Sequence, residues 1–264
     1  MPPLDVFYVV LLFPMIAGVG WGVVKLLLSL AYRDRAGTVM MRQSGWLHLA
    51  FLSIPTLLVL ELGRREETLG AMGLRWPDMA PLPAWLGGPL VLLAAAAVGL
   101  LLYVNELMLS AQVRRLLTRD GRAPINALVQ GRSAALGALG APPMGSFMAA
   151  SALTSFAEEL VWRGFLVYWL TSRWGLPLPQ ALILPALLFG INHAYFGLRN
   201  VVLKTVDGVV WGLLLVLTSS ILAPFVSHLA FQYLVWRRLD RRHRTAVASS
   251  GMGAPAAAGG FRGA

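Results

Sequence analysis

Three ionisable residues lie in the middle of an otherwise apolar stretch, residues 146–170 (SFMAASALTSFAEELVWRGFLVYWL). They are Glu158, Glu159 and Arg163. The stretch is long and apolar enough to cross a bilayer, where a charged residue at the centre costs roughly 2.5–3.5 kcal/mol on insertion scales. Charges at this depth are retained where they face a polar interior. They therefore mark a functional site by default.

The spacing divides these charges into a pair and a single carboxylate. Glu159 precedes Arg163 by four residues, which is the favourable order for an ion pair on a helix. Glu158 is rotated from Glu159 by about 100° on a helix of 3.6 residues per turn, so it is left to act as a general base or acid. The other interpretation, that all three charges only hold helices together, is weaker because helix packing in membranes more often uses Ser, Thr or Asn.

Two histidines occur on later apolar segments. His193 follows Asn192 in LLFGINHAYFG, and His228 lies in APFVSHLAFQYLVW with Gln232 one turn later on the same face. Taken alone, His193 is equally well explained as an interfacial residue whose ring bonds a backbone carbonyl. Together, three helices are each expected to bring one proton-transfer or ligand group toward the membrane interior: Glu158, His193 and His228.

This set of side chains allows two forms of water activation. His193, His228 and Glu158 can bind one divalent metal such as zinc, with water as the fourth ligand. They can equally hold a water without any metal while Glu158 takes its proton. Both forms predict hydrolysis. The absence of cysteine excludes a thiol nucleophile, and neither an HExxH nor a GxSxG motif is present.

Three motifs in order resemble the CPBP family of intramembrane proteases, which includes the CAAX proteases and bacteriocin-related (Abi-type) members. They read EExxxR, FxxxH and HxxxQ, at 158–163, 189–193 and 228–232. The resemblance covers roughly residues 146–236, and LGAMGLRWPD at 69–78 is similar to a segment that often precedes the core. It implies an endopeptidase whose site residues lie in these three motifs.

The resemblance also implies a role for each position. Glu158 would activate the attacking water with help from His193, and His228 with the following amide would polarise the scissile carbonyl. Glu159, Arg163, Asn192 and Phe189 would support these groups. The family usually has Asn or Asp at the last position, whereas this chain has Gln232, whose amide extends one methylene further.

The composition predicts the elements that must position these residues. Of 264 residues, 57% are apolar and 13% are charged, which indicates an integral membrane protein and excludes an ordinary soluble domain. About seven apolar runs are present, so the expected fold is an all-α, polytopic transmembrane helical bundle with its active site inside the membrane. The runs are residues 4–32, 45–62, 83–104, 146–170, 178–193, 200–217 and 219–236.

The basic residues predict the orientation of this bundle. The net charge of +10 does not indicate nucleic-acid binding, because Lys and Arg fall between apolar runs instead of on one soluble face. Most of them, Lys204 included, fall in alternate segments, which predicts an outer N-terminus and a cytoplasmic C-terminus. The abundance of Arg, Ala, Leu and Gly is typical of a bacterial protein, so the expected location is a bacterial inner membrane. The first run lacks the features of a cleaved signal peptide and is expected to be a retained helix.

The expected organisation has three parts. Residues 1–145 form N-terminal transmembrane helices and a connecting segment, 146–239 form a catalytic-like core, and 240–264 form a basic, disordered tail. The leading hypothesis is a CPBP-type intramembrane endopeptidase that cuts a peptide or protein substrate in or beside the lipid bilayer.

Two other functions are compatible with buried charges. One is a non-catalytic membrane immunity or regulatory protein that binds a peptide or lipid in the same cavity. The other is a proton-coupled transporter, since Glu and His also build proton relays. Many transporters show two similar halves, and this chain shows none, so the transporter is the weaker of the two.

Overall fold

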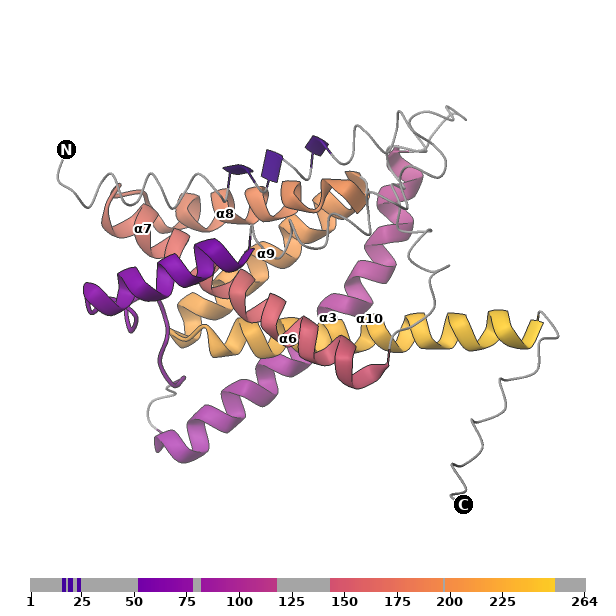
Figure 1. The fold of residues 1–264 in the computed structure, drawn as a ribbon, viewed down its shortest axis with the longest axis horizontal. Coiled ribbons are helices and arrows are strands. Elements are labelled where there is room, and N and C mark those ends of the chain that lie inside the picture. Colours follow the sequence, from indigo (N-terminus) through magenta and orange to yellow (C-terminus); the bar gives the residue numbers. More distant parts are fainter. Residues whose placement is uncertain are drawn as a thin grey trace, which may run out of the picture.

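The computed structural model describes residues 52–77, 82–117, 143–196 and 198–249, together with 16–17, 19–20 and 23–24. Within these ranges all regular structure is helical, which confirms the all-α prediction. A helix at 52–65 precedes the labelled elements (Figure 1). These are α3 (Ala84–Leu117), α6 (Met144–Glu158), η1 (Glu159–Phe165), α7 (Leu166–Ser172), α8 (Leu178–Asn192), η2 (Ala194–Phe196), α9 (Leu198–Thr218) and α10 (Leu222–Ser249).

Two of the described helices are long and apolar enough to cross a membrane, Ala84–Leu109 within α3 and Leu198–Thr218. The apolar helix α8 is shorter than a full span. The predicted run 4–32 lies almost wholly outside the described residues, and 45–62 lies partly outside them. Two membrane-capable helices are therefore established, and the count of seven stays a prediction.

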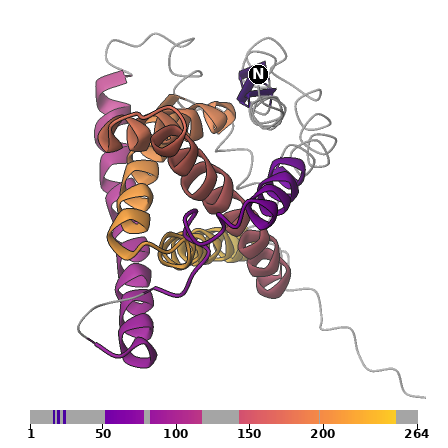
Figure 2. The same cartoon turned by 90° about the vertical axis from the view of Figure 1, so that its left-hand side faces the viewer.

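The helices cross one another around α10. In Figure 1, α3 and α6 both cross α10, and Figure 2 shows α10 nearly end-on while α3 runs along one side of the molecule. Gly99 permits the contact between α3 and α10, because a Cβ at this position would collide with the backbone carbonyl of Ser227. Gly190 on α8 similarly faces Thr205 on α9. Small residues at these contacts bring the backbones close together, as is common between membrane helices.

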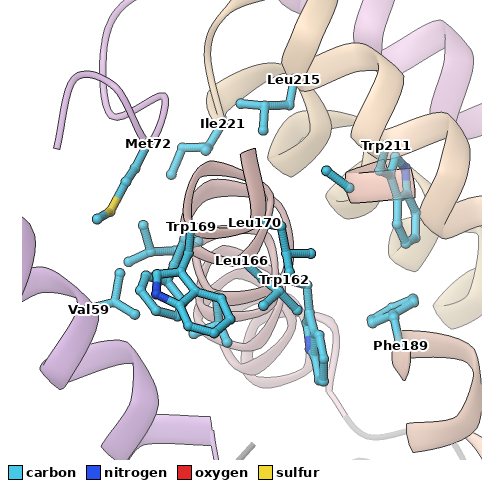
Figure 3. Close-up of a cluster of buried hydrophobic side chains, with 14 of the residues drawn as sticks. Val59, Met72, Trp162, Leu166, Trp169, Leu170, Phe189, Trp211, Leu215 and Ile221 are labelled. Carbon is cyan, nitrogen blue, oxygen red and sulfur yellow. The ribbon is translucent and has the colours of Figure 1, made fainter. Parts of the chain in front are cut away.

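The hydrophobic core surrounds the segment η1. Leu160 and Phe165 from η1 are fully buried with Phe189 of α8, Trp211 of α9 and Ile221. Figure 3 shows Phe189 and Trp211 on one side of this cluster and Met72 on the other. The charged residues of the first motif are thus enclosed by large apolar side chains from several helices.

Residues 69–77 of the segment LGAMGLRWPD pack against the turn between α9 and α10. Met72 is buried, and the carbonyl of Gly73 accepts a hydrogen bond of 2.9 Å from the backbone N–H of Ile221. Arg75 Nε donates to the carbonyl of Ser219 at 2.7 Å, and Ser220 Oγ donates to the carbonyl of Arg75 at 2.6 Å. This segment therefore fixes the start of α10, the helix that carries His228.

Helix α10 is longer than the sequence predicts. It continues to Ser249, so residues 240–249 are helical where a disordered tail is expected, and its end projects beyond the other helices (Figure 1). Asp240 and Arg244 form an i,i+4 ion pair of 2.9 Å on this part of the helix. Arg, Leu and Ala are also good helix formers, which favours continuation of the helix. The rest of the predicted tail lies outside the described residues.

Candidate active site

The first motif lies where the predicted helix 146–170 changes its winding. The helix is observed as α6, the π-helix η1 and α7 in direct succession, and all seven residues of η1 are buried. The π-helix begins at Glu159 and includes Arg163. Single π turns occur frequently at functional sites, because the wider turn changes which side chains share a face.

Glu159 binds two partners with one oxygen. Its Oε1 lies 3.3 Å from Arg163 Nη1, which is the ion pair that the spacing predicts. The same Oε1 lies 2.9 Å from Nδ1 of His228 on α10. Glu159 and Arg163 are essentially inaccessible to solvent. Glu159 therefore connects the first motif to the third, a link that the sequence analysis did not predict.

Aromatic rings cover the guanidinium of Arg163. Its Cζ lies 4.2 Å from the ring centroid of Phe189 and 5.3 Å from that of Trp211. A cation over an aromatic face is attracted by the ring quadrupole, so these rings offset part of the cost of burying the charge. Phe189 thus contacts Arg163 of the first motif directly.

The imidazole of His228 is held from three directions. Its Nδ1 faces Glu159, and because an ionised carboxylate only accepts, Nδ1 carries the proton of this hydrogen bond. Its Nε2 lies 3.9 Å from Glu158 Oε2 and 3.5 Å from Gln232 Nε2. Trp211 stacks on the ring face at a centroid distance of 4.0 Å. A carboxylate and an amide therefore both lie near Nε2 of this buried imidazole.

His193 caps the C-terminal end of α8, directly after Asn192. Its Nδ1 lies 2.8 Å from the carbonyl oxygen of Phe189, which can only accept, so Nδ1 donates; when the ring is neutral, the lone pair lies on Nε2. The centroid of Phe189 lies 4.6 Å from the His193 ring and 6.4 Å from the His228 ring. Both histidines thus border the same phenylalanine, and a contact of His193 with Glu158 stays a prediction.

The described residues do not fit the predicted metal alternative. In these ranges no group of three or more His, Cys, Asp or Glu side chains is arranged to hold a metal ion. His228 also directs Nδ1 to Glu159 and only Nε2 toward Glu158.

A second buried charge cluster was missed by the sequence analysis. Lys204 Nζ lies 2.8 Å from Glu106 Oε2 on α3 and 2.8 Å from Asp207 Oδ2 on α9, and 3.9 Å from the ring centroid of Phe231. Counting Lys204 as a loop charge was wrong, because it lies within α9 and is mostly buried. The i,i+3 pair of Lys204 and Asp207 in an apolar helix was the signal that could have revealed this cluster.

The comparisons with known proteins agree with the motifs. Residues 140–234 match the family model described as type II CAAX prenyl endopeptidase Rce1-like, and this segment contains all three motifs. No curated protein and no solved structure gives a significant match to the chain. The matched family consists of membrane-embedded proteases, which agrees with two apolar helices among the described residues. Residues 140–234 of the chain are therefore similar to the CAAX prenyl endopeptidase family.

Proposed function

We propose that the protein is an intramembrane peptidase that hydrolyses a peptide bond in or beside the bilayer with a water activated by Glu158. One observation carries the proposal. His228 Nε2 lies 3.9 Å from Glu158 Oε2 and 3.5 Å from Gln232 Nε2, and Glu158 and His228 are at most 5% exposed. A carboxylate and an amide beside a buried imidazole are the groups that hydrolysis of a carbonyl compound requires.

The charges of this cluster favour one shared proton. Glu159 is balanced by Arg163, which leaves Glu158 beside His228. An uncompensated charge is costly in a low-dielectric interior, so the cluster is most stable when Glu158 and His228 together hold one proton beyond the one on Nδ1. In one arrangement Glu158 is ionised and His228 carries a proton on each nitrogen. This is the arrangement that hydrolysis needs.

The first step is attack of water on the scissile carbonyl carbon. Glu158 removes one proton as the new carbon–oxygen bond forms. The carbonyl oxygen becomes an oxyanion, to which His228 Nε2–H and the Gln232 amide donate hydrogen bonds. His193 supports this step because its Nε2 can accept the second hydrogen of the water and fix its orientation.

The second step breaks the carbon–nitrogen bond. The tetrahedral intermediate collapses to a carboxyl group, and Glu158 returns its proton to the leaving amine. The net change is addition of one water to the peptide bond, with Glu158 and His228 restored to their starting protonation. No other reactant is needed.

Gln232 fits this role despite being longer than Asn or Asp. Its amide nitrogen reaches to 3.5 Å from His228 Nε2, so the amide lies beside the imidazole, one turn later on α10. This geometry supports hydrolysis over the non-catalytic alternative. In that alternative, the cavity would bind a peptide or lipid without any requirement for a base.

The test compares wild-type protein with Glu158→Gln in the native membrane. New peptide N-termini are identified by mass spectrometry of membranes from cells that express each variant. We expect at least one cut that is present with the wild type and absent with Glu158→Gln. Glu61→Gln is the matched control, because the Glu61 side chain is 40% exposed and pairs with neighbouring arginines on its own helix. The Glu61→Gln variant should therefore give the same cuts as the wild type.

Undiminished cleavage by a folded Glu158→Gln variant would overturn the assignment. A cellular phenotype that survives Glu158→Ala, with no cut lost, would instead support the immunity or regulatory function. The two results are separable because the first concerns a chemical product and the second a phenotype.

A further inference from the structure

Trp211 lies at the centre of the candidate site, although no motif contains it. Its side chain is fully buried on α9, and its ring stacks on His228 with an interplanar angle of 20°. Its Nε1 donates a hydrogen bond of 3.1 Å to Oγ of Ser227, the residue that precedes His228. Trp211 is therefore hydrogen-bonded to the side chain that precedes His228 in the chain, and it covers the imidazole of His228.

We propose that Trp211 is a positioning residue that fixes the ring plane of His228. The final torsion of a histidine side chain is broad and roughly two-fold, so the backbone alone does not set the direction of the ring nitrogens. The hydrogen bond to Glu159 selects one of the two flipped orientations. The indole of Trp211, whose ring centroid lies 4.0 Å from that of His228, then blocks the perpendicular orientation through which the imidazole would pass during a flip.

Neighbouring rings hold the indole in turn. Phe231 meets Trp211 edge to face at 6.2 Å and 89°, and Phe189 does so at 6.0 Å and 74°. Edge-to-face pairs are favourable arrangements of aromatic rings, so the indole plane is constrained on two sides as well as by Ser227. The imidazole therefore rests against a rigid surface, with Nε2 directed toward Glu158 and Gln232.

The chemical consequence rests on the proposed function. If His228 polarises a carbonyl, its Nε2–H must point to where the oxyanion forms, and a misplacement of about 1 Å can cost about 10²-fold in rate. Trp211 would then act on the transition state through His228 without touching the substrate. Its loss should lower kcat and leave KM nearly unchanged.

The first measurement does not depend on activity. The chain contains four histidines, so ¹⁵N-histidine labelling gives a small set of imidazole signals, and the His228→Gln variant identifies those of His228. For the wild type we expect one ring orientation, in which Nδ1 always carries a proton and faces Glu159. Trp211→Leu should give averaged signals from both neutral tautomers, whereas Trp211→Phe, which keeps an aromatic face, should retain the wild-type form.

Trp169→Leu is the matched control. Trp169 is also buried, and it stacks on Phe165 in the core, so its replacement removes the same volume without uncovering His228. Its His228 signals should equal those of the wild type. Ser227→Ala provides a variant without a large cavity, and it should broaden the His228 signals by freeing the indole.

The second measurement is the rate of cleavage of a substrate identified with the wild type. Trp211→Leu should lower kcat by about 10²-fold with little change in KM, and Trp211→Phe should restore most of the rate. Wild-type ¹⁵N signals in both Trp211→Leu and Ser227→Ala would overturn the role of Trp211. Absence of cleavage by the wild type would overturn the peptidase proposal alone, because the tautomer measurement still decides the positioning role.

Discussion

Glu159 is the residue on which the buried charges depend. It accepts from Arg163 at 3.3 Å and from His228 at 2.9 Å, and it is fully buried. Glu159→Gln would leave the guanidinium without its counter-charge, which typically costs about 3–5 kcal/mol for a buried pair. We expect the free energy of unfolding, measured by denaturant titration in detergent and followed by circular dichroism, to fall by about this amount.

Glu158→Gln is the control at the adjacent position. Glu158 Oε2 lies 3.9 Å from His228 Nε2, which is too long for a direct hydrogen bond. Replacing Glu158 by its neutral isostere should therefore lower the free energy of unfolding much less than Glu159→Gln does. An equal loss in both variants would show that the two carboxylates share one structural role. That result would contradict the division of the pair into a supporting acid and a reactive one.

At the scale of elements, a glycine on α9 allows the first motif to fit. A Cβ at Gly208 would lie 3.0 Å from Ala186 Cα on α8 and 3.2 Å from Arg163 Nη2. Gly208→Ala should therefore push these groups apart and lower the free energy of unfolding by about 1–3 kcal/mol, as overpacking typically does. The same denaturant titration measures this loss.

Gly145→Ala is the matched control for this prediction. No atom lies within 4 Å of a Cβ at Gly145 on α6, so the change should be neutral or stabilising by up to about 1 kcal/mol. If Gly208→Ala were as well tolerated as Gly145→Ala, the close contact of α9 with η1 would not be required for stability.

The elements also show what the sequence could predict. The pair of Glu159 and Arg163 follows from their spacing, because residues four apart face one another in an α-helix and nearly do so in the wider π-helix. The π winding itself could not be predicted, because π turns are rare insertions in α-helices and the apolar periodicity does not reveal them. The contacts of Glu159 with His228 and of Lys204 with Glu106 join residues far apart in the chain, which periodicity cannot detect.

At the scale of the whole molecule, contacts between chain connections support the predicted alternation of the helices. Three connections are predicted to lie outside: the one before α3, the one between α7 and α8, and the one between α9 and α10. They contact one another, as Glu66 pairs with Arg173 at 3.5 Å and Arg75 bonds to Ser219 at 2.7 Å. On the side predicted to be cytoplasmic, Lys204 near the start of α9 reaches Glu106 toward the end of α3. Helix ends of the same predicted side thus lie together.

This arrangement predicts a cytoplasmic end for α10, whose last turns carry five arginines between 237 and 244. Short segments rich in Arg are retained in the cytoplasm during insertion. Green fluorescent protein fused after Ser249 should therefore be fluorescent, and alkaline phosphatase at the same position should be inactive, because each reporter works on one side only. The same fusions after Gly175, in the turn between α7 and α8, should give the opposite signals. Active phosphatase after Ser249 would reverse the orientation and place His193, at the α8–α9 connection, on the outer side of the membrane.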